Sequence, residues 1–130
     1  MIESVTPVLP VDRIEPSIDF FSRVGFEKVT EVPEGDHLGF VILMQGDVQV
    51  MYQTRTSIFD DSGMLPNETE GTPVLLFVKT GNLNACMKAL DGYEVVMAER
   101  TTFYGAREIG YREPGGHIVT FAEFSSEAES

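Results

Sequence analysis

Few residues of this chain could carry out acid–base, nucleophilic or metal chemistry. The imidazoles are His37 and His117, and the single thiol is Cys86. A histidine titrates near neutral pH, so either imidazole could act as a general base. Two histidines and one cysteine exclude an intramolecular disulfide, a cysteine-cluster metal site and a multi-histidine metal site within one chain.

Carboxylates late in the chain are the other candidates for proton transfer. Glu108 and Glu113 could each accept a proton, but no second catalytic group stands at a meaningful spacing from them. We therefore expect both to be surface charges, or to pair with Arg107 or Arg112.

The imidazoles and the thiol also have simple structural interpretations. His117 directly follows Gly115 and Gly116, which favours a solvent-facing position in a turn, and His37 opens a strand beyond an acidic turn. Cys86 falls on or beside the apolar face of an expected helix. We expect it to pack in the core, because a nucleophilic thiol requires a low pKa and exposure.

Composition and charge limit the classes of partner. The 130 residues include 9 Lys and Arg against 21 Asp and Glu, a net charge of −12, and 42% of them are hydrophobic. A chain of this length and apolarity forms one domain with a real core. The negative charge opposes binding to nucleic acid or to anionic membranes, since phosphates are neutralised by Lys and Arg.

Targeting and membrane signals are absent from the sequence. No apolar stretch approaches the ~20 residues needed to span a bilayer, and the N-terminus lacks a basic region followed by an apolar run. We expect a cytoplasmic protein.

The first half of the chain predicts one helix and four strands. The helix covers about 14–24, where Asp12 could provide the N-terminal cap and Gly25 a left-handed C-terminal cap. Apolar alternation and turn residues predict strands at 4–10, 26–32, 37–44 and 48–53.

The second half repeats this order after an irregular, acidic segment at 54–72. Asn82 is expected to cap a helix that carries Leu83, Met87 and Leu90 on one face and ends at Asp91-Gly92. Strands are predicted at 74–79, 93–97, 107–113 and 118–124, and residues 125–130 form a frayed tail.

The repeated order of elements predicts the fold class. We expect an α+β protein, a single domain over 1–130, with two tandem βαβββ modules at 4–53 and 73–124 joined by the 54–72 loop. Each module would form a mixed sheet with its helix outside. The two sheets would curve into an open trough, and pairing at their edges would favour a homodimer.

Several side chains fall on strands predicted to line this trough. A polar residue among apolar ones there could orient a small ligand, although half of the set could face the helices or solvent instead. These residues are Gln49, Tyr52, Phe77, Arg107, Tyr111 and Phe121.

The order of motifs resembles the vicinal oxygen chelate superfamily, which includes glyoxalase I, extradiol dioxygenases and bleomycin resistance proteins. The resemblance spans about Val5 to Phe124 and is specific for the fold rather than for one activity. It is carried by Pro7-Val8-Leu9-Pro10-Val11-Asp12, Ser17-Ile18-Asp19-Phe20-Phe21, Val24-Gly25-Phe26, Tyr104-Gly105-Ala106-Arg107-Glu108, Arg112-Glu113-Pro114-Gly115-Gly116-His117 and Val119-Thr120-Phe121-Ala122-Glu123.

The metal-dependent members of that superfamily place His, Gln or Glu at four strand positions. By resemblance these positions fall at Thr6, Gln49, Pro73 and Thr120. None is a carboxylate or an imidazole, and a divalent ion needs several such ligands. We therefore expect no metal and no cofactor.

The metal-free, bleomycin-resistance-like branch is the closer resemblance. It implies a homodimer that sequesters a small organic molecule, with Tyr104 and the adjacent Phe103 at the mouth of the trough, and we expect Tyr104 and Arg107 to contact the ligand. The acidic charge would attract a cationic ligand if it were concentrated there.

Two alternatives to a sequestering protein remain open. One is a superfamily enzyme (a lyase, dioxygenase or transferase) with an unusual or absent metal site that involves Gln49, Glu108 or His117. The other is a non-catalytic dimerisation or regulatory module.

Overall fold

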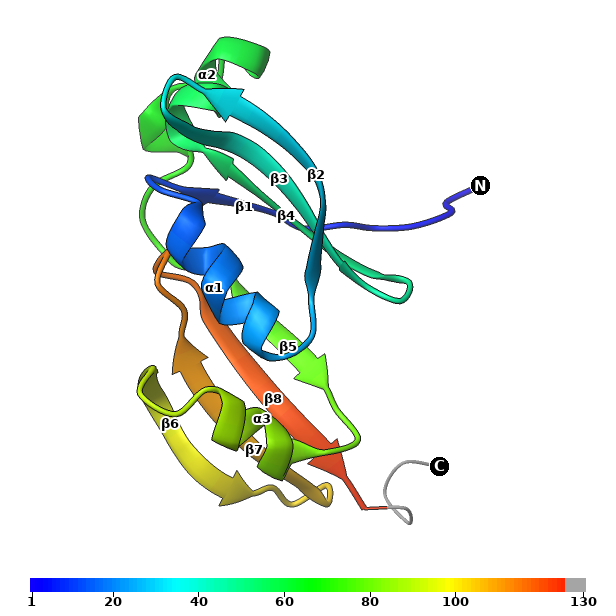
Figure 1. The fold of residues 1–130 in the computed structure, drawn as a ribbon. Coiled ribbons are helices and arrows are strands. Elements are labelled where there is room, and N and C mark those ends of the chain that lie inside the picture. Colours follow the sequence, from blue (N-terminus) through cyan, green and yellow to red (C-terminus); the bar gives the residue numbers. More distant parts are fainter. Residues whose placement is uncertain (126–130) are drawn as a thin grey trace. The chain divides into compact units, whose positions relative to one another are not determined.

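Each half of the chain contains a four-stranded mixed β-sheet with a helix against one face (Figure 1). The computed structural model describes residues 1–125. The chain divides into two compact units, Met1–Thr72 and a second that begins at Pro73. Each unit is described by itself.

The first unit has the strand order β1-β4-β3-β2. Strand β1 pairs in parallel with β4, and the other neighbours are antiparallel. Helix α1 connects β1 to β2 at the opposite edge of the sheet, so this connection is a crossover. The elements are β1 (Val8–Val11), α1 (Glu15–Arg23), β2 (Glu27–Glu34), β3 (His37–Gln45) and β4 (Val48–Thr54).

Helix α1 begins and ends with local signals that the sequence carries. Pro16 lies in its first turn, and Gly25 adopts a φ of +100° directly after the C-cap residue. The predicted Asp12 cap is wrong. Ile14 occupies the N-cap position without a side-chain bond, and the Asp12 carboxylate accepts a hydrogen bond from Arg55 instead.

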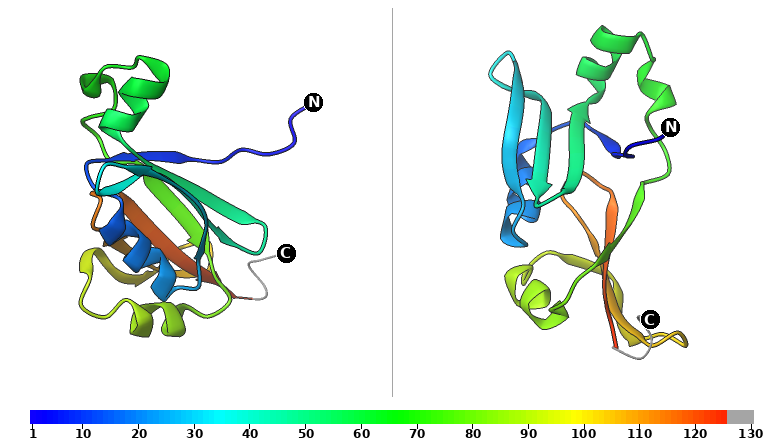
Figure 2. Two further views of the ribbon diagram at one scale, coloured as in Figure 1. Left: turned by 45° about the horizontal axis from the view of Figure 1, so that its top comes forward. Right: turned by 90° about the vertical axis from the view of Figure 1, so that its right-hand side faces the viewer.

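Helix α1 lies against one face of the sheet of the first unit (Figure 2), and the core of the unit lies between them. The helix contributes Phe20 and Phe21, both fully buried. Strand alternation places Val41 and Leu43 of β3 and Val50 and Tyr52 of β4 in the buried layer.

A further helix, α2 (Arg55–Ser62), lies within the segment expected to be irregular. The Thr54 hydroxyl caps it by accepting from the Ser57 N–H at 3.1 Å, and Gly63 closes it with a φ of +77°. Only Ile58 is buried. A short 3₁₀ helix, η1 (Pro66–Glu68), follows.

The second unit repeats the arrangement as β5-β8-β7-β6, with β5 parallel to β8. Helix α3 is capped by Asn82, whose Oδ1 accepts from the Ala85 N–H at 3.0 Å, as predicted. Strand β6 is longer than the sequence indicates. The elements are β5 (Leu75–Lys79), α3 (Leu83–Ala89), β6 (Glu94–Thr101), β7 (Ala106–Arg112) and β8 (Ile118–Phe124).

The predicted α+β class with two tandem βαβββ modules is confirmed. Of the expected tail at 125–130, residues 126–130 lie outside the described part. Within residues 1–125, no helix has the length and apolar character needed to cross a membrane.

Candidate functional site

The sheet of the second unit has two chemically different faces. Ile109 and Tyr111 of β7 and Val119 and Phe121 of β8 are buried on the side of α3. The opposite side, called the helix-free face below, carries the alternate residues. The register between neighbouring strands places these residues in rows across the sheet. One row contains Phe77, Thr120 and Gly110, and another contains Ala122, Glu108 and Arg100.

Glu108 is a buried carboxylate on the helix-free face, with 2% of its surface exposed. Its Oε1 accepts from Arg100 Nε at 2.9 Å and from Nη2 at 2.6 Å, and its Oε2 accepts from the Tyr104 hydroxyl at 3.0 Å. Burying a charge is costly unless it is paired and hydrogen-bonded. Arg100 and Tyr104 therefore allow Glu108 to be buried.

Aromatic rings surround this carboxylate. Tyr104 stacks on Phe124, with ring centroids 5.8 Å apart, and Phe124 contacts Phe77 edge-on at 6.3 Å. Lys79 Nζ lies 5.4 Å from the Phe124 ring centroid. Phe77 is nevertheless 55% exposed and its neighbour Leu75 70% exposed. The face thus presents apolar and aromatic surface beside one buried charge.

A depression of about 280 Å³ lies among these side chains and is called the Glu108 site below. Gly110 leaves room in this part of the sheet, because a Cβ there would come within 3.1 Å of Met97 Cβ and 3.4 Å of Thr120 Oγ1. The lining residues are Leu75, Leu76, Phe77, Met97, Arg100, Tyr104, Glu108 and Thr120.

Two of the residues predicted from the sequence, Phe77 and Tyr104, lie in the Glu108 site. Phe103 is fully exposed beside it, with its ring edge-on to Tyr104 at 5.1 Å. Arg100 was not singled out from the sequence. Glu108 is buried and paired with Arg100, so the prediction of a surface charge or of a pair with Arg107 or Arg112 is wrong. The alternation of Glu108 with the apolar Ile109 along β7 was the signal available for its face.

Arg107 lies on the opposite side of β7 from Glu108. Its Nη2 donates to Asn84 Oδ1 of α3 at 2.6 Å, and its Nε lies 3.1 Å from Glu99 Oε2. Glu123 also holds α3, because its Oε1 accepts the Leu83 N–H at 2.6 Å. Arg107 therefore positions α3 and is separate from the Glu108 site.

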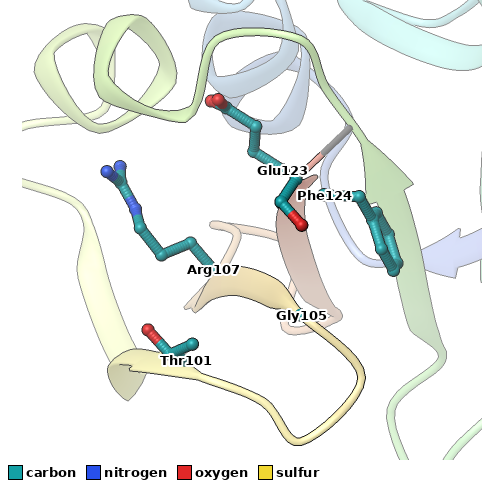
Figure 3. Close-up of a pocket in the computed structure, with 6 residues that line it drawn as sticks. Thr101, Gly105, Arg107, Glu123 and Phe124 are labelled. Atoms are coloured by element: carbon teal, nitrogen blue, oxygen red, sulfur yellow. The ribbon is translucent and has the colours of Figure 1, made fainter. Parts of the chain in front are cut away.

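Figure 3 shows a second depression, of about 280 Å³, on the Arg107 side. The adjacent residues Glu123 and Phe124 point to opposite sides of β8 there. Its described polar side chains include Arg107 and Glu123, which already bind α3, so it offers a weaker site than the depression around Glu108.

Tyr52 and Tyr111 lie in the cores, which corrects their predicted place on the open surface. Tyr52 is fully buried and its ring lies 6.1 Å from Phe21 of α1. Tyr111 packs edge-on against the buried Phe121 at 6.0 Å. Burial raises the pKa of the Tyr111 hydroxyl, with smaller contributions from Cys86 and Asp91. The strand register turns both rings toward the helices.

Gln49 lies in the first unit, where its Nε2 donates to Thr6 Oγ1 at 3.4 Å. An amide and a hydroxyl are neutral ligands, and neither Pro73 nor Thr120 supplies a charged group. These four residues do not fit a divalent ion. Among residues 1–125, no group of three or more His, Cys, Asp and Glu is placed to hold a metal.

His117 and Glu113 are buried, contrary to the expected exposed turn. Glu113 accepts the backbone N–H groups of Gly115 at 2.7 Å and His117 at 3.1 Å. His117 Nδ1 accepts the Val74 N–H at 2.9 Å. These bonds fix the turn before β8 and tie it to β5, because buried polar groups of a tight turn need partners.

His37 forms a small charged cluster at the turn between β2 and β3. Its Nδ1 lies 3.0 Å from Asp36 Oδ1 and its Nε2 lies 2.9 Å from Glu34 Oε1. The hydrogen bonds to Asp36 and Glu34 raise the pKa of His37. The Thr54 hydroxyl is within 3.1 Å of both Glu34 oxygens, so the cluster connects this turn to the start of α2.

Known proteins resemble this chain in structure more clearly than in sequence. No protein-family model matches the chain, and no curated protein matches its sequence. A glyoxalase/bleomycin resistance protein/dioxygenase from Nocardioides has a TM-score of 0.75 at 17% identity, over 97% of this chain and 86% of that one.

Two bleomycin-related structures are similar over comparable lengths. A bleomycin resistance determinant encoded on the transposon Tn5 has a TM-score of 0.68 at 16% identity, over 95% of this chain and 99% of that one. A bleomycin-binding protein complexed with bleomycin has a TM-score of 0.65 at 17% identity, over 95% and 100%. The chain therefore has the fold of the vicinal oxygen chelate superfamily, as the sequence motifs predict.

Proposed function

We propose that the protein binds a small organic molecule with a flat apolar or aromatic part at the Glu108 site, and holds it without altering it. The observation that carries the proposal is that exposed apolar side chains, Leu75 and Phe77, lie beside a buried carboxylate whose two oxygens both accept hydrogen bonds. Exposed apolar patches and convergent polar groups are the usual components of a ligand site.

The size of the depression limits the ligand. About 280 Å³ is just below the roughly 300–1,000 Å³ typical of ligand pockets. A molecule of one or two rings fits this volume. The bleomycin-binding structure supports the view that this fold can hold an organic ligand.

The candidate proton acceptors already accept hydrogen bonds from other groups of the protein, which favours binding without reaction. Both oxygens of Glu108 accept hydrogen bonds from side chains. Glu113 and His117 accept backbone N–H groups in the turn before β8. None of these three is poised to take a proton from a ligand, which supports sequestration over the enzymatic alternative.

The acidic net charge is distributed unevenly, which bears on the ligand's charge. Residues 1–72 hold 13 acidic and 4 basic side chains, whereas residues 73–125 hold 6 acidic and 5 basic. The acidic excess is therefore not concentrated in the unit that contains the Glu108 site. The net charge of the protein therefore does not favour a cationic ligand at the Glu108 site.

Self-association is the second candidate, because Leu75 and Phe77 could contact a second copy of the chain instead of a ligand. Light scattering of the purified protein, with and without Leu75→Asp, separates the two. A homodimer that Leu75→Asp dissociates would assign this face to the dimer.

An uncharged fluorescent probe, 2-naphthylmethanol, tests the proposal directly. We expect saturable one-to-one binding that Phe77→Ala weakens about tenfold, because a ring contact is lost from the ligand. Phe59→Ala is the matched control, since Phe59 is a similarly exposed phenylalanine on α2. Mass spectrometry should recover the probe unaltered. Absence of saturable binding, or equal effects of the two substitutions, would overturn the proposal.

A further inference from the structure

Arg100 has more hydrogen-bonding capacity than its partner uses. A guanidinium carries five N–H donors. Its Nε and Nη2 bind Glu108 Oε1, whereas Nη1 makes no hydrogen bond to the part of the chain that the structure describes. The Arg100 side chain is 58% exposed while that of Glu108 is 3% exposed. The accessible charge of this ion pair is therefore the positive one.

The pairing with Glu108 also fixes the guanidinium. Two N–H groups on one carboxylate oxygen, itself buried in the sheet, restrict the rotation of a long and flexible side chain. A donor that is already oriented loses less entropy when a ligand binds it. Glu108 is thus a positioning residue that acts through Arg100.

Other groups around the site are consistent with an accessible positive charge. Lys79 lies beside the Phe124 ring, and Phe124 stacks on Tyr104. Among the residues that line the depression, Arg100 and Glu108 are the only charged ones described, and Glu108 is buried. A ligand entering the Glu108 site would meet aromatic surface and one exposed cation.

We propose that the Glu108 site is specific for a small aromatic carboxylate, whose acidic group binds the Arg100 guanidinium while its ring contacts Phe77 and Tyr104. This inference rests on the proposed function and names its ligand class. Guanidinium and carboxylate form strong charge-assisted hydrogen bonds, and a planar ring suits an aromatic surface.

Three probes that share one ring system measure this specificity. The test titrates the protein with 2-naphthoate, 2-naphthylmethanol and 2-naphthylmethylammonium at constant ionic strength. We expect 2-naphthoate to bind at least about tenfold more tightly than the alcohol, since charge-assisted bonds are the stronger class. The ammonium should bind more weakly than the alcohol, because it would face Arg100.

Variants assign the preference to Arg100. Arg100→Gln should abolish the preference, so that this variant binds 2-naphthoate no more tightly than it binds the alcohol, and Arg100→Lys should restore part of the preference. Arg112→Gln is the matched control, because Arg112 pairs with Glu94 elsewhere in the same sheet. If Arg100→Gln does not fold, Arg100→Gln with Glu108→Gln removes both charges and should give the same loss of preference.

The outcomes separate this inference from the proposed function. Failure of all three probes to bind would overturn both. Binding of the alcohol with no preference for 2-naphthoate, or a preference that survives Arg100→Gln, would overturn the inference alone. Tightest binding by the ammonium, abolished in Glu108→Gln, would show that the site selects cations through Glu108.

Discussion

The two units share one topology but use their aromatic residues differently. The first buries Phe20, Phe21, Phe26 and Tyr52, and three of these rings contact Phe21. Among the described residues of the second, only Tyr111 and Phe121 are buried aromatics. Phe77, Phe103 and Tyr104 of that unit are exposed.

Buried polar groups differ in the same direction. In the first unit they are the neutral Ser17 and Thr54, whereas in the second they are Glu108, Glu113 and His117. Buried ionisable groups cost stability unless every bond is made. The first unit therefore has the larger buried aromatic cluster, whereas the second leaves aromatic rings exposed and buries ionisable side chains.

The largest expected contrast comes from deleting one ring in each unit. Phe21→Ala should lower the free energy of unfolding by about 3–5 kcal/mol, because it leaves a cavity among three aromatic neighbours. Phe77→Ala should cost less than about 1 kcal/mol, because Phe77 is more than half exposed. Denaturant unfolding of both variants measures the difference. Equal losses would break the comparison.

Next in size is the effect of leaving Glu108 without its arginine. Arg100→Gln should cost about 2 kcal/mol, since a buried carboxylate then keeps only Tyr104. The expected loss in the free energy of unfolding is smaller than for a fully buried ion pair, because Arg100 is exposed. Adding Glu108→Gln should recover most of the loss. A double variant less stable than Arg100→Gln would contradict the account of Glu108.

Helix caps provide a smaller and matched pair. Asn82→Ala should cost about 1 kcal/mol through α3, and Thr54→Ala somewhat more through α2. The reason for the difference is that the Thr54 hydroxyl also binds Glu34. Thermal unfolding compares the two, with Thr56→Ala as an exposed control in α2. If Thr54→Ala lowers the unfolding temperature no more than Thr56→Ala does, the Thr54 cap does not stabilise α2.

The smallest effect is a pH dependence of the first unit. Hydrogen bonds to Asp36 and then Glu34 raise the pKa of His37 above its ordinary 6.5. A raised folded-state pKa stabilises the fold below pH 6.5, and the contribution disappears as pH rises through the folded value. His37→Gln should therefore lose more stability at about pH 5.5 than at about pH 8.5. Parallel pH profiles of the two proteins would contradict this.

Much of the fold follows from local signals in the sequence. Apolar periodicity, the Asn82 cap and Gly25 and Gly92 after the helices were sufficient to predict two βαβββ modules. Helix α2 escaped prediction because its residues lack an amphipathic pattern and bury only Ile58. Its formation depends on Thr54 and Gly63.

The site was harder to predict because its determinants are not local. A register shift of one residue turns a side chain to the other face of the sheet. The register of each strand therefore determines that Phe77 lies at the surface and that Tyr111 lies in the core. The burial of Glu108 depends on Arg100, which irregular pairing between β6 and β7 brings opposite it. Spacing along one strand does not contain this information.

The central claim is that the helix-free face of the second unit binds a small aromatic molecule. Amide chemical-shift mapping during titration with 2-naphthoate tests it most directly. We expect saturable shifts in β5, β7, β8, the turn at Tyr104 and β6 around Arg100, with the sheet of the first unit unaffected. Shifts confined to the first unit, or no saturable shifts, would contradict it.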